Sequence, residues 1–301
     1  MLRLTEIKLE LEHTYDELIN AICFKLSIQP EEVLSYTIFK RSYDARRSAM
    51  CWIYALDVEV QNEAEILESL FNSPHVSQTP DMSYTHVGQA PANLTERPIV
   101  VGFGPCGFFA ALTLAQMGFK PIVLERGKEV RERTKDTWDL WRKNILNPES
   151  NVQFGEGGAG TFSDGKLYSQ ARDPRYLGRK VIQEFIQAGA PDEIAYENHP
   201  HIGTFRLVGM VEKIRETIIG LGGEIRFEHK VSDVLIDEVA GVRQIRGVVL
   251  ADGSELLSNH IVMALGHSSR DTFKMLFERG VYIEAKPFSI GFRVEHPQSV
   301  I

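Results

Sequence analysis

The chain has 301 residues, which at about 150 residues per domain predicts roughly two domains. Its formal net charge is −8, and a chain this acidic is a poor candidate for bulk nucleic-acid binding, which needs cations to replace counterions. Glycine (24 residues) and proline (13 residues) are too few for collagen-like or low-complexity classes. The composition therefore indicates an ordinary globular protein.

The cysteines favour a reducing compartment, because the three present include no CxxC pair and cannot form a disulfide framework. The acidic start lacks the apolar core of a signal peptide. The uncharged stretch over 98–119 is long enough for a membrane span, but glycines and prolines interrupt it and a continuous helix would not tolerate them. We therefore expect a cytoplasmic protein without a membrane span, and we find no metal-ligand pattern.

Residues 1–72 are predicted to form a small α+β domain of order β-α-β-β-α. Thr14 and Glu17 form a capping box ahead of helical periodicity, and apolar alternation predicts a strand over 52–60. This domain could dock an acidic partner such as RNA, or a protein, although a solvated face is the expected role of its basic and aromatic cluster (Phe39, Lys40, Arg41, Tyr43, Arg46 and Arg47). Residues 73–96, rich in Ser, Pro and Gln, are predicted to be a linker.

The sequence VVGFGPCG over residues 100–107 follows an apolar strand and precedes a helix. In this pattern Gly102 permits a tight turn, Gly104 lets the backbone approach a pyrophosphate, and Gly107 lets the helix pack on the strand. The N–H groups that begin the helix favour phosphate. Glu125 ends the second strand, 23 residues after Gly102. Its carboxylate can accept hydrogen bonds from ribose hydroxyls and disfavours the 2′-phosphate of NADP.

A second glycine-rich stretch, FGEGGAGTFSDGKL, covers residues 154–167. It formally matches GxGxxG and nearly a P-loop, but no apolar strand precedes it and Leu167 stands where a P-loop needs Ser or Thr. We interpret it as a loop of unusual backbone freedom that lies against a planar or anionic cofactor and carries Ser163, Asp164 and Lys166. A flexible surface loop is the alternative.

Helices are predicted around 134–145, 173–186 and 207–221, followed by a strand-rich segment over 224–265. Asp252–Gly253 marks a hairpin in that segment. The buried strand over 261–265 runs into a turn at Gly266 and His267. In two-domain flavoproteins such a strand returns to the nucleotide domain.

With these motifs, the chain resembles the bacterial FAD-dependent dehydrogenase family, flavoproteins related to glutathione-reductase-like enzymes. The resemblance rests on 97–107, 123–127, 151–167, 201–204, 264–268 and 286–289, and it extends over essentially the whole chain. It implies an α/β fold: a doubly wound, Rossmann-like FAD-binding domain (97–170 and 222–270) with an inserted strand-rich substrate domain (171–221 and 271–301), preceded by the small α+β domain. Family members run beyond residue 301, so we expect the substrate domain to be incomplete.

The resemblance also implies which residues hold FAD. The pyrophosphate would meet the glycine turn, Glu125 the ribose, Arg126 and Arg133 the adenosine half, and the Val231 backbone the adenine. The complete implied set is Gly102, Gly104, Pro105, Cys106, Gly107, Glu125, Arg126, Arg133, Gly157, Gly158, Ala159, Gly160, Thr161, Ser163, Val231, Ala264 and Gly266. We expect Cys106 to be a small apolar filler. Catalytic residues stay unassigned, with Ser163, Asp164, Lys166, His267 and Arg293 as candidates.

The sequence thus predicts an FAD-dependent oxidoreductase, a dehydrogenase that transfers hydride through the flavin to or from a small molecule. No second well-placed GxGxxG unit is present, so we expect NAD(P)H to bind only transiently if it is the electron donor. Two alternatives stay open. One is a sensor or docking module in which FAD is structural and residues 1–72 bind a protein partner; the other is an NAD-dependent dehydrogenase.

Overall fold

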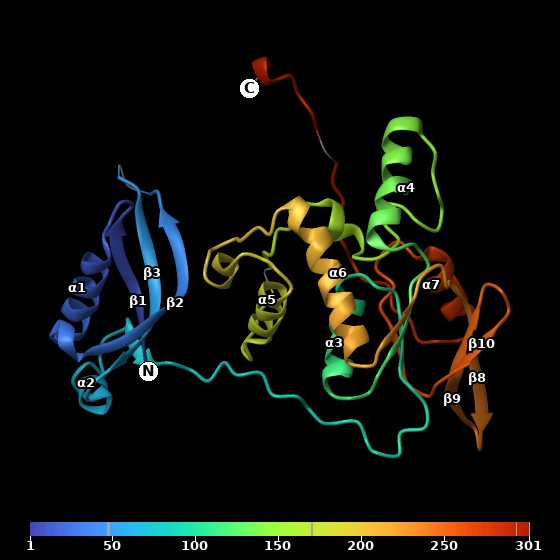
Figure 1. Cartoon of the computed structure of the whole chain (residues 1–301), viewed down its shortest axis with the longest axis horizontal. Helices are drawn as coiled ribbons and strands as arrows, with labels where there is room; N and C mark the ends of the chain where they lie inside the picture. Colours follow the sequence, from blue (N-terminus) through green and yellow to red (C-terminus); the bar gives the residue numbers. More distant parts are fainter. Residues whose placement is uncertain (47–48, 170, 293, 301) are drawn as a thin grey trace.

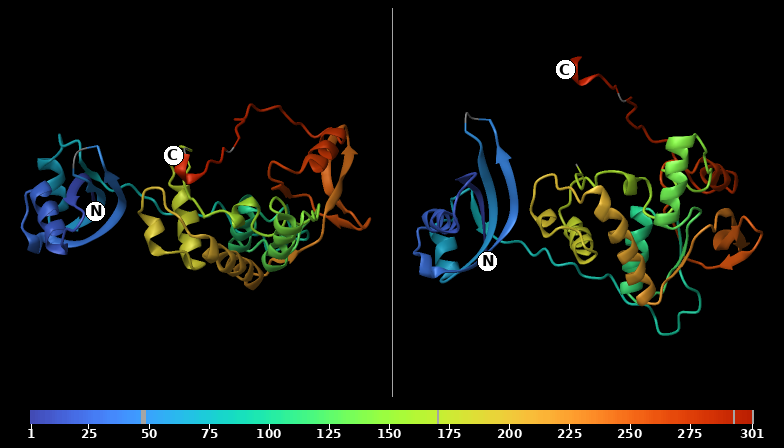
Figure 2. Two further views of the ribbon diagram at one scale, coloured as in Figure 1. Left: turned by 90° about the horizontal axis from the view of Figure 1, so that it is seen from above. Right: turned by 45° about the horizontal axis from the view of Figure 1, so that its top comes forward.

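The computed structural model describes residues 1–46, 49–169, 171–292 and 294–300. A small N-terminal unit lies at one end of the molecule, and an extended segment connects it to a larger body (Figures 1 and 2). After the last long helix the chain runs out from the body as an extended tail ending in a short 3-10 helix, η4 (Gln298–Val300). Among the described residues, no helix is both long enough and apolar enough to cross a membrane.

The N-terminal unit is an antiparallel sheet of order β2-β3-β1-β4. Apolar side chains of the strands, such as Leu4 and Leu56, form a buried core with Ile22 of α1 and Ile66 of α2. The chain order βαββαβ with this strand order is the split βαβ arrangement. Its elements are β1 (Leu2–Glu10), α1 (Tyr15–Leu26), η1 (Pro30–Glu32), β2 (Val33–Asp44), β3 (Cys51–Val60), α2 (Glu63–Ser69) and β4 (Val76–Gln78).

Strand β4 lies inside the range that the sequence predicts as a linker. It pairs with β1, so that Val76 is opposite Leu4 and buried. A strand of three residues is too short to show a period, and only one of its side chains is buried, which explains why the sequence pattern missed it. The sheet therefore extends beyond residue 72. The predicted capping box is present at the start of α1, where Thr14 and Glu17 bond to each other's main-chain N–H groups.

The larger body is built around a parallel sheet of order β11-β5-β6-β7. Alternate residues of its strands point to opposite faces. Val100 and Val123 pack with helices on one face, whereas Ile99 and Leu124 pack with an antiparallel sheet on the other. The strands are β5 (Ile99–Val101), β6 (Ile122–Leu124), β7 (Glu224–Arg226) and β11 (Ile261–Met263).

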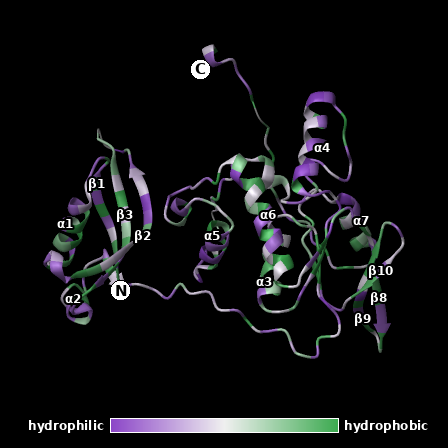
Figure 3. Cartoon of the chain, viewed as in Figure 1, coloured by the Kyte–Doolittle hydropathy of each residue, from purple (hydrophilic) through white to green (hydrophobic). Residues whose placement is uncertain are grey.

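Helices α3 and α6 pack together on the first face, and the sheet β10-β9-β8 with α7 covers the second. In Figure 3 the ribbon of α6 alternates hydrophobic and hydrophilic residues, whereas α4 is largely hydrophilic. The remaining elements are α3 (Pro105–Gln116), α4 (Val130–Lys143), η2 (Ala159–Phe162), α5 (Leu177–Gln187), η3 (Asp192–Ala195), α6 (Thr204–Gly220), β8 (Val231–Val239), β9 (Val242–Leu250), β10 (Glu255–Leu257) and α7 (Arg270–Glu278).

This arrangement corrects two parts of the predicted architecture. The second face of the parallel sheet is covered mainly by strands rather than by helices, and those strands lie in the range 222–270 that we assigned to the FAD-binding domain. The described residues of the predicted substrate domain, 171–221 and 271–300 with its gap at 293, contain helices and no strand. Because α6 and Phe185 of α5 belong to the same core as α3, residues 171–221 are part of the body rather than a strand-rich insert.

The N-terminal unit contacts the body through the main chain of β2. The N–H of Arg41 donates to the carbonyl oxygen of Tyr196 (2.7 Å), and the N–H of Asn198 donates to the carbonyl oxygen of Arg41 (2.9 Å). The Arg41 side chain also pairs with Glu197. Arg46 pairs with Asp44, so two cations of the predicted basic cluster have carboxylate partners; Arg47 lies outside the described residues.

Candidate nucleotide-binding site

A cavity of about 320 Å³ lies where β5, β6 and β11 end. The carboxyl ends of parallel strands are where open α/β sheets bind ligands. Many of the residues implied as cofactor-binding lie on its wall: Gly102, Gly104, Pro105, Cys106, Glu125, Arg126, Gly158, Ala159, Gly160, Val231, Ala264 and Gly266. The other implied residues, Gly107, Arg133, Gly157, Thr161 and Ser163, do not line it.

The glycine turn after β5 is as tight as its sequence predicts. Gly102 has a φ of +98°, and a Cβ there would stand 2.4 Å from the carbonyl oxygen of Ala264. A Cβ on Gly107 would stand 1.9 Å from the carbonyl oxygen of Gly102, so only glycine lets α3 pack this closely on β5. Helix α3 begins after Gly104 without a side-chain cap. The N–H groups of its first turn are therefore available to an anion at the cavity.

Glu125 is held rigidly at the end of β6. Its side chain is 4% exposed. One carboxylate oxygen accepts the N–H of Phe103 (2.8 Å), and the other accepts those of Gly127 (2.8 Å) and Gly155 (3.0 Å). A carboxylate has about four lone-pair positions, so acceptor capacity remains on the cavity side. The group thus joins the first glycine turn to the second glycine-rich loop and presents an acceptor to the cavity.

The second glycine-rich loop forms the opposite wall. The N–H of Gly157 donates to the carbonyl oxygen of Phe103 (2.9 Å), which ties the loop to the first turn. Gly158 packs back to back with Gly104, because a Cβ on Gly158 would stand 3.0 Å from the Gly104 Cα. A Cβ on Gly160 or Gly266 would meet nothing within 4 Å. Bare backbone at these two glycines therefore leaves open space that a side chain would otherwise fill.

Arg133, which the resemblance placed beside the adenosine half, does not line the cavity. Its side chain is fully buried beneath the loop and donates to the carbonyl oxygens of Asn151 (2.8 Å), Val152 (2.7 Å) and Glu156 (2.6 Å). Burial lowers the pKa of Arg133 to about 10. The Glu156 carboxylate accepts the N–H of Val130 at the start of α4, and burial raises its pKa to about 7. Both residues hold the loop.

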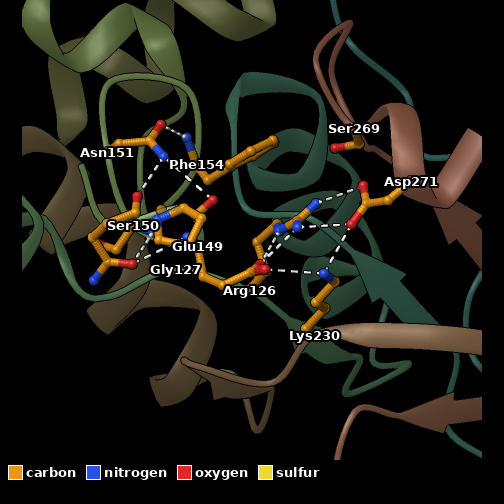
Figure 4. Close-up of polar contacts among 12 residues, drawn as sticks. Arg126, Gly127, Glu149, Ser150, Asn151, Phe154, Lys230, Ser269 and Asp271 are labelled. Atoms are coloured by element: carbon orange, nitrogen blue, oxygen red, sulfur yellow. Dashed lines mark hydrogen bonds and ion pairs between the residues drawn. The ribbon is translucent and has the colours of Figure 1, made fainter.

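Arg126 lines the cavity and belongs to an ionic network (Figure 4). Arg126 and Lys230 each contact the carboxylates of Glu149 and Asp271. The guanidinium of Arg126 also lies 4.2 Å from the ring centroid of Phe154. Hydrogen bonding from Arg126 holds the pKa of Asp271 well below its usual range. This network joins α7 to the loop before the second glycine-rich stretch.

Of the catalytic candidates in the described residues, His267 alone reaches the cavity wall. Its Nδ1 lies 2.6 Å from the Ser268 hydroxyl oxygen. Asp164 and Lys166 lie elsewhere, with Asp164 3.6 Å from Lys166 and 3.7 Å from His201. Ser163 bonds to the carbonyl oxygen of Gly160, and Arg293 lies outside the described residues. The structure therefore keeps Asp164 beside Lys166 but does not bring them to the cavity wall that His267 lines.

The cavity wall also holds residues that the sequence reasoning missed. His229 and Lys230 precede β8, Gln153 precedes the second glycine-rich stretch, and Phe154 is its first residue. The position of His229 shortly after β7 was the available signal, because residues after parallel strands gather at one edge of the sheet. For Gln153 and Phe154 the signal was their place in the segment 151–167 on which the resemblance rests.

A second, mostly apolar cavity of about 680 Å³ adjoins the first. The two share Cys106, Ala264, Leu265 and Gly266 on their walls. Cys106 is exposed and lines both cavities, at the start of α3.

FAD, the cofactor that the resemblance implies, fits the donors and acceptors of this site. Free N–H groups of α3 suit a pyrophosphate, Glu125 suits ribose hydroxyls, and the bare backbone at Gly160 and Gly266 leaves room for a chain of phosphates. The volume of 320 Å³ is at the lower end of the range for ligand pockets, which suits the adenosine diphosphate half of a dinucleotide.

Sequence comparison links the chain to proteins without an assigned activity. Residues 1–59 match a family described as a domain of unknown function (DUF8436). An uncharacterized protein of Clostridium beijerinckii is 41% identical over 301 residues, which is 100% of this chain and 55% of that protein. The chain thus spans about half the length of the curated relative that it matches.

Solved structures give more distant likenesses. THI4 of Thermovibrio ammonificans is 17% identical, with 62% of this chain and 64% of that chain covered and a TM-score of 0.42. A 3-ketosteroid dehydrogenase of Rhodococcus jostii is 14% identical, with 58% and 48% covered and a TM-score of 0.35. Quinol fumarate reductase of E. coli is 16% identical, with 61% and 37% covered and a TM-score of 0.38. The strand order and register of this chain, rather than these distant likenesses, define its fold.

Proposed function

We propose that the chain is the FAD-binding part of an oxidoreductase whose substrate is a small molecule. The observation that carries the proposal is the cavity itself. An uncapped helix N-terminus, an anchored carboxylate and two bare glycine backbones meet at the carboxyl edge of a parallel sheet. That combination matches the needs of a dinucleotide: charge stabilisation for phosphate, acceptors for ribose, and close backbone approach.

A bound flavin would supply the hydride chemistry. The chain's own residues bind and orient. The first-turn N–H groups of α3 stabilise negative charge, and Glu125 fixes the ribose by accepting hydrogen bonds from its hydroxyls. The loop at Gly158 excludes water from one side because it packs against Gly104.

The first experiment is a visible absorption spectrum of the purified chain, with the cofactor released by heat and identified by mass. We expect the flavin spectrum and the mass of FAD. A colourless protein that also fails to bind added FAD would refute the proposal for this chain. If the released molecule has the mass of NAD, the cofactor is a nicotinamide dinucleotide and the proposal of FAD is wrong.

A matched pair of variants locates the binding. Gly160→Leu adds a large side chain to the cavity wall, at a position where nothing stands within 4 Å of the Cβ. We expect the FAD dissociation constant to rise at least about tenfold, a loss of about 1.4 kcal/mol. Gly209→Leu is the control, because this glycine also has open space but lies exposed on α6, away from the cavity. Equal loss in both variants would place the cofactor elsewhere.

A second candidate function is a docking or sensing module in which the dinucleotide is structural. In an enzyme, catalytic candidates such as Ser163, Asp164, His267 and Arg293 would converge on the flavin. Of those that the structure describes, His267 alone lines the cavity, and this observation favours the module. Anaerobic titration with NADH and NADPH separates the candidates. Loss of the flavin absorbance supports the oxidoreductase, whereas an oxidised spectrum that no such donor changes supports the module.

A further inference from the structure

Strand β2 of the N-terminal unit is an edge strand with no protection along part of its length. It is outermost in the sheet order β2-β3-β1-β4. Residues 33–38 read VLSYTI, a run without a charge or a proline. Edge strands that stay free in solution usually carry lysines, prolines or bulges that prevent pairing with other chains. The pairing of β2 with β3 has a register shift between Val33 and Ser35, but none from Ser35 to Ile38. This part of the edge, without a charge or a proline, is open to pairing with another chain.

A groove runs along this edge, between β2 and helix α1. Its volume is about 780 Å³, and Tyr15, Ile19, Tyr36 and Ile38 form much of its wall. Large apolar side chains stay uncovered there: Tyr15 is 65% exposed and Leu34 is 56% exposed. A groove between an edge strand and a helix is the geometry in which an extended peptide adds a strand to a sheet and places alternate side chains in pockets.

The same edge already binds an extended segment farther along. Arg41 exchanges main-chain hydrogen bonds with Tyr196 and Asn198, in a parallel bridge between Arg41 and Glu197. Tyr196 also lines the groove, so the groove is continuous with this contact. The edge of β2 therefore already accepts one added segment, at Arg41. Residues 33–38 are the part of the same edge that this segment does not cover.

The charges around the groove select the partner. Asp16 is the one charged residue on the described groove wall. Glu31 and Glu32 stand in η1, directly before β2. An occupant with cationic side chains is therefore favoured over an acidic or uncharged one.

We propose that the groove binds an extended segment of a partner protein, with apolar side chains at alternate positions and lysine or arginine between them. Residues 33–38 span about 20 Å at roughly 3.3 Å per residue, so the segment pairs over about six residues. The site is separate from the nucleotide cavity, and its existence does not depend on which cofactor that cavity takes.

The test uses the full chain and a blocked, fluorescent peptide, Lys-Val-Lys-Val-Lys-Val-Lys, in an anisotropy titration. Two further peptides carry N-methyl groups on the valines or on the lysines, which removes alternate N–H donors without changing side chains. Because a strand turns alternate N–H groups to opposite edges, we expect one of these peptides to bind at least about tenfold more weakly and the other to keep its affinity. Equal binding of all three would overturn strand addition.

A charge-reversal pair tests the groove. Asp16→Lys changes a first-turn acid of α1 that lines the groove, and Glu65→Lys changes a first-turn acid of α2 that does not. We expect Asp16→Lys to weaken peptide binding about fivefold and Glu65→Lys by less than about twofold. Equal effects would place the peptide elsewhere. Light scattering of the free chain completes the test, because a dimer that the peptide dissociates would assign the edge to a second copy and overturn the proposal of a partner.

Discussion

Replacing Glu125 by glutamine should destabilise the larger body strongly, even without a ligand. The carboxylate accepts three main-chain N–H groups while buried. A glutamine oxygen can keep the two bonds to Gly127 and Gly155, but its NH₂ group then faces the N–H of Phe103. The Phe103 N–H and the amide N–H that faces it are then two donors without acceptors, each costing about 1–3 kcal/mol, and the two remaining bonds lose the strength of a charged acceptor. The total is at least about 3 kcal/mol.

The assay is urea unfolding followed by tryptophan fluorescence in a Trp52→Phe background, so that Trp138 and Trp141 of α4 report the body. Glu149→Gln is the matched control. Glu149 is also an acid in ion pairs near the cavity, but its side chain is 40% exposed, so its loss should cost about 1 kcal/mol or less. If Glu125→Gln were no more destabilising than Glu149→Gln, the buried acceptor would not be what holds the two glycine-rich segments together.

Other variants test the packing and the buried charges. Gly107→Ala should fail to give a folded body by circular dichroism, because its Cβ would stand 1.9 Å from a carbonyl oxygen; normal folding would show that α3 can shift away. Glu156 has a pKa raised to about 7 from an ordinary 4.5, so the folded state holds its proton more tightly than the unfolded state does. Stability should therefore fall as pH rises from about 4.5 to about 7, by about 3 kcal/mol at most. Chemical unfolding at several pH values should show a shallower fall in Glu156→Gln, and unchanged slopes would contradict the assignment. Arg3→Ala should cost about 3–5 kcal/mol in unfolding followed by Trp52 fluorescence, because it leaves the buried carboxylate of Asp57 unpaired; a cost below about 1 kcal/mol would mean that water reaches Asp57.

The sequence predicts the parts of the site that depend on local chemistry. The glycine turn and Glu125 follow from neighbouring residues and one strand spacing, and the structure places both at the cavity. Their contacts with a cofactor stay a prediction. Arg133 was misplaced, because a polar helix gives no sign of which arginine turns inward beneath a loop. Asp164 and Lys166 were chosen as catalytic candidates beside His267 because of their chemistry alone. The structure places these two residues near each other but away from the cavity wall that His267 lines. Those positions depend on tertiary packing.

The covering of the parallel sheet shows the same limit. The pattern over 224–265 predicts strands and a hairpin at Asp252–Gly253, and the structure has β9 and β10 around that turn. Periodicity reports that such strands have a buried face, but not what that face meets. Val234 and Val248 meet Ile99 and Leu124, a contact between residues more than a hundred positions apart.

The buried guanidinium of Arg133 has a kinetic consequence for whatever molecule occupies the cavity. Lifting the loop would separate that cation from three carbonyl oxygens, so we expect this wall to open more slowly than the wall facing it. The facing wall, at the start of α7, is held by the ion pairs that Asp271 makes with Arg126 and Lys230. The side chain of Asp271 is 46% exposed. Such pairs are weak and are screened by salt. Exchange should therefore pass by α7, and residence times should shorten as ionic strength rises.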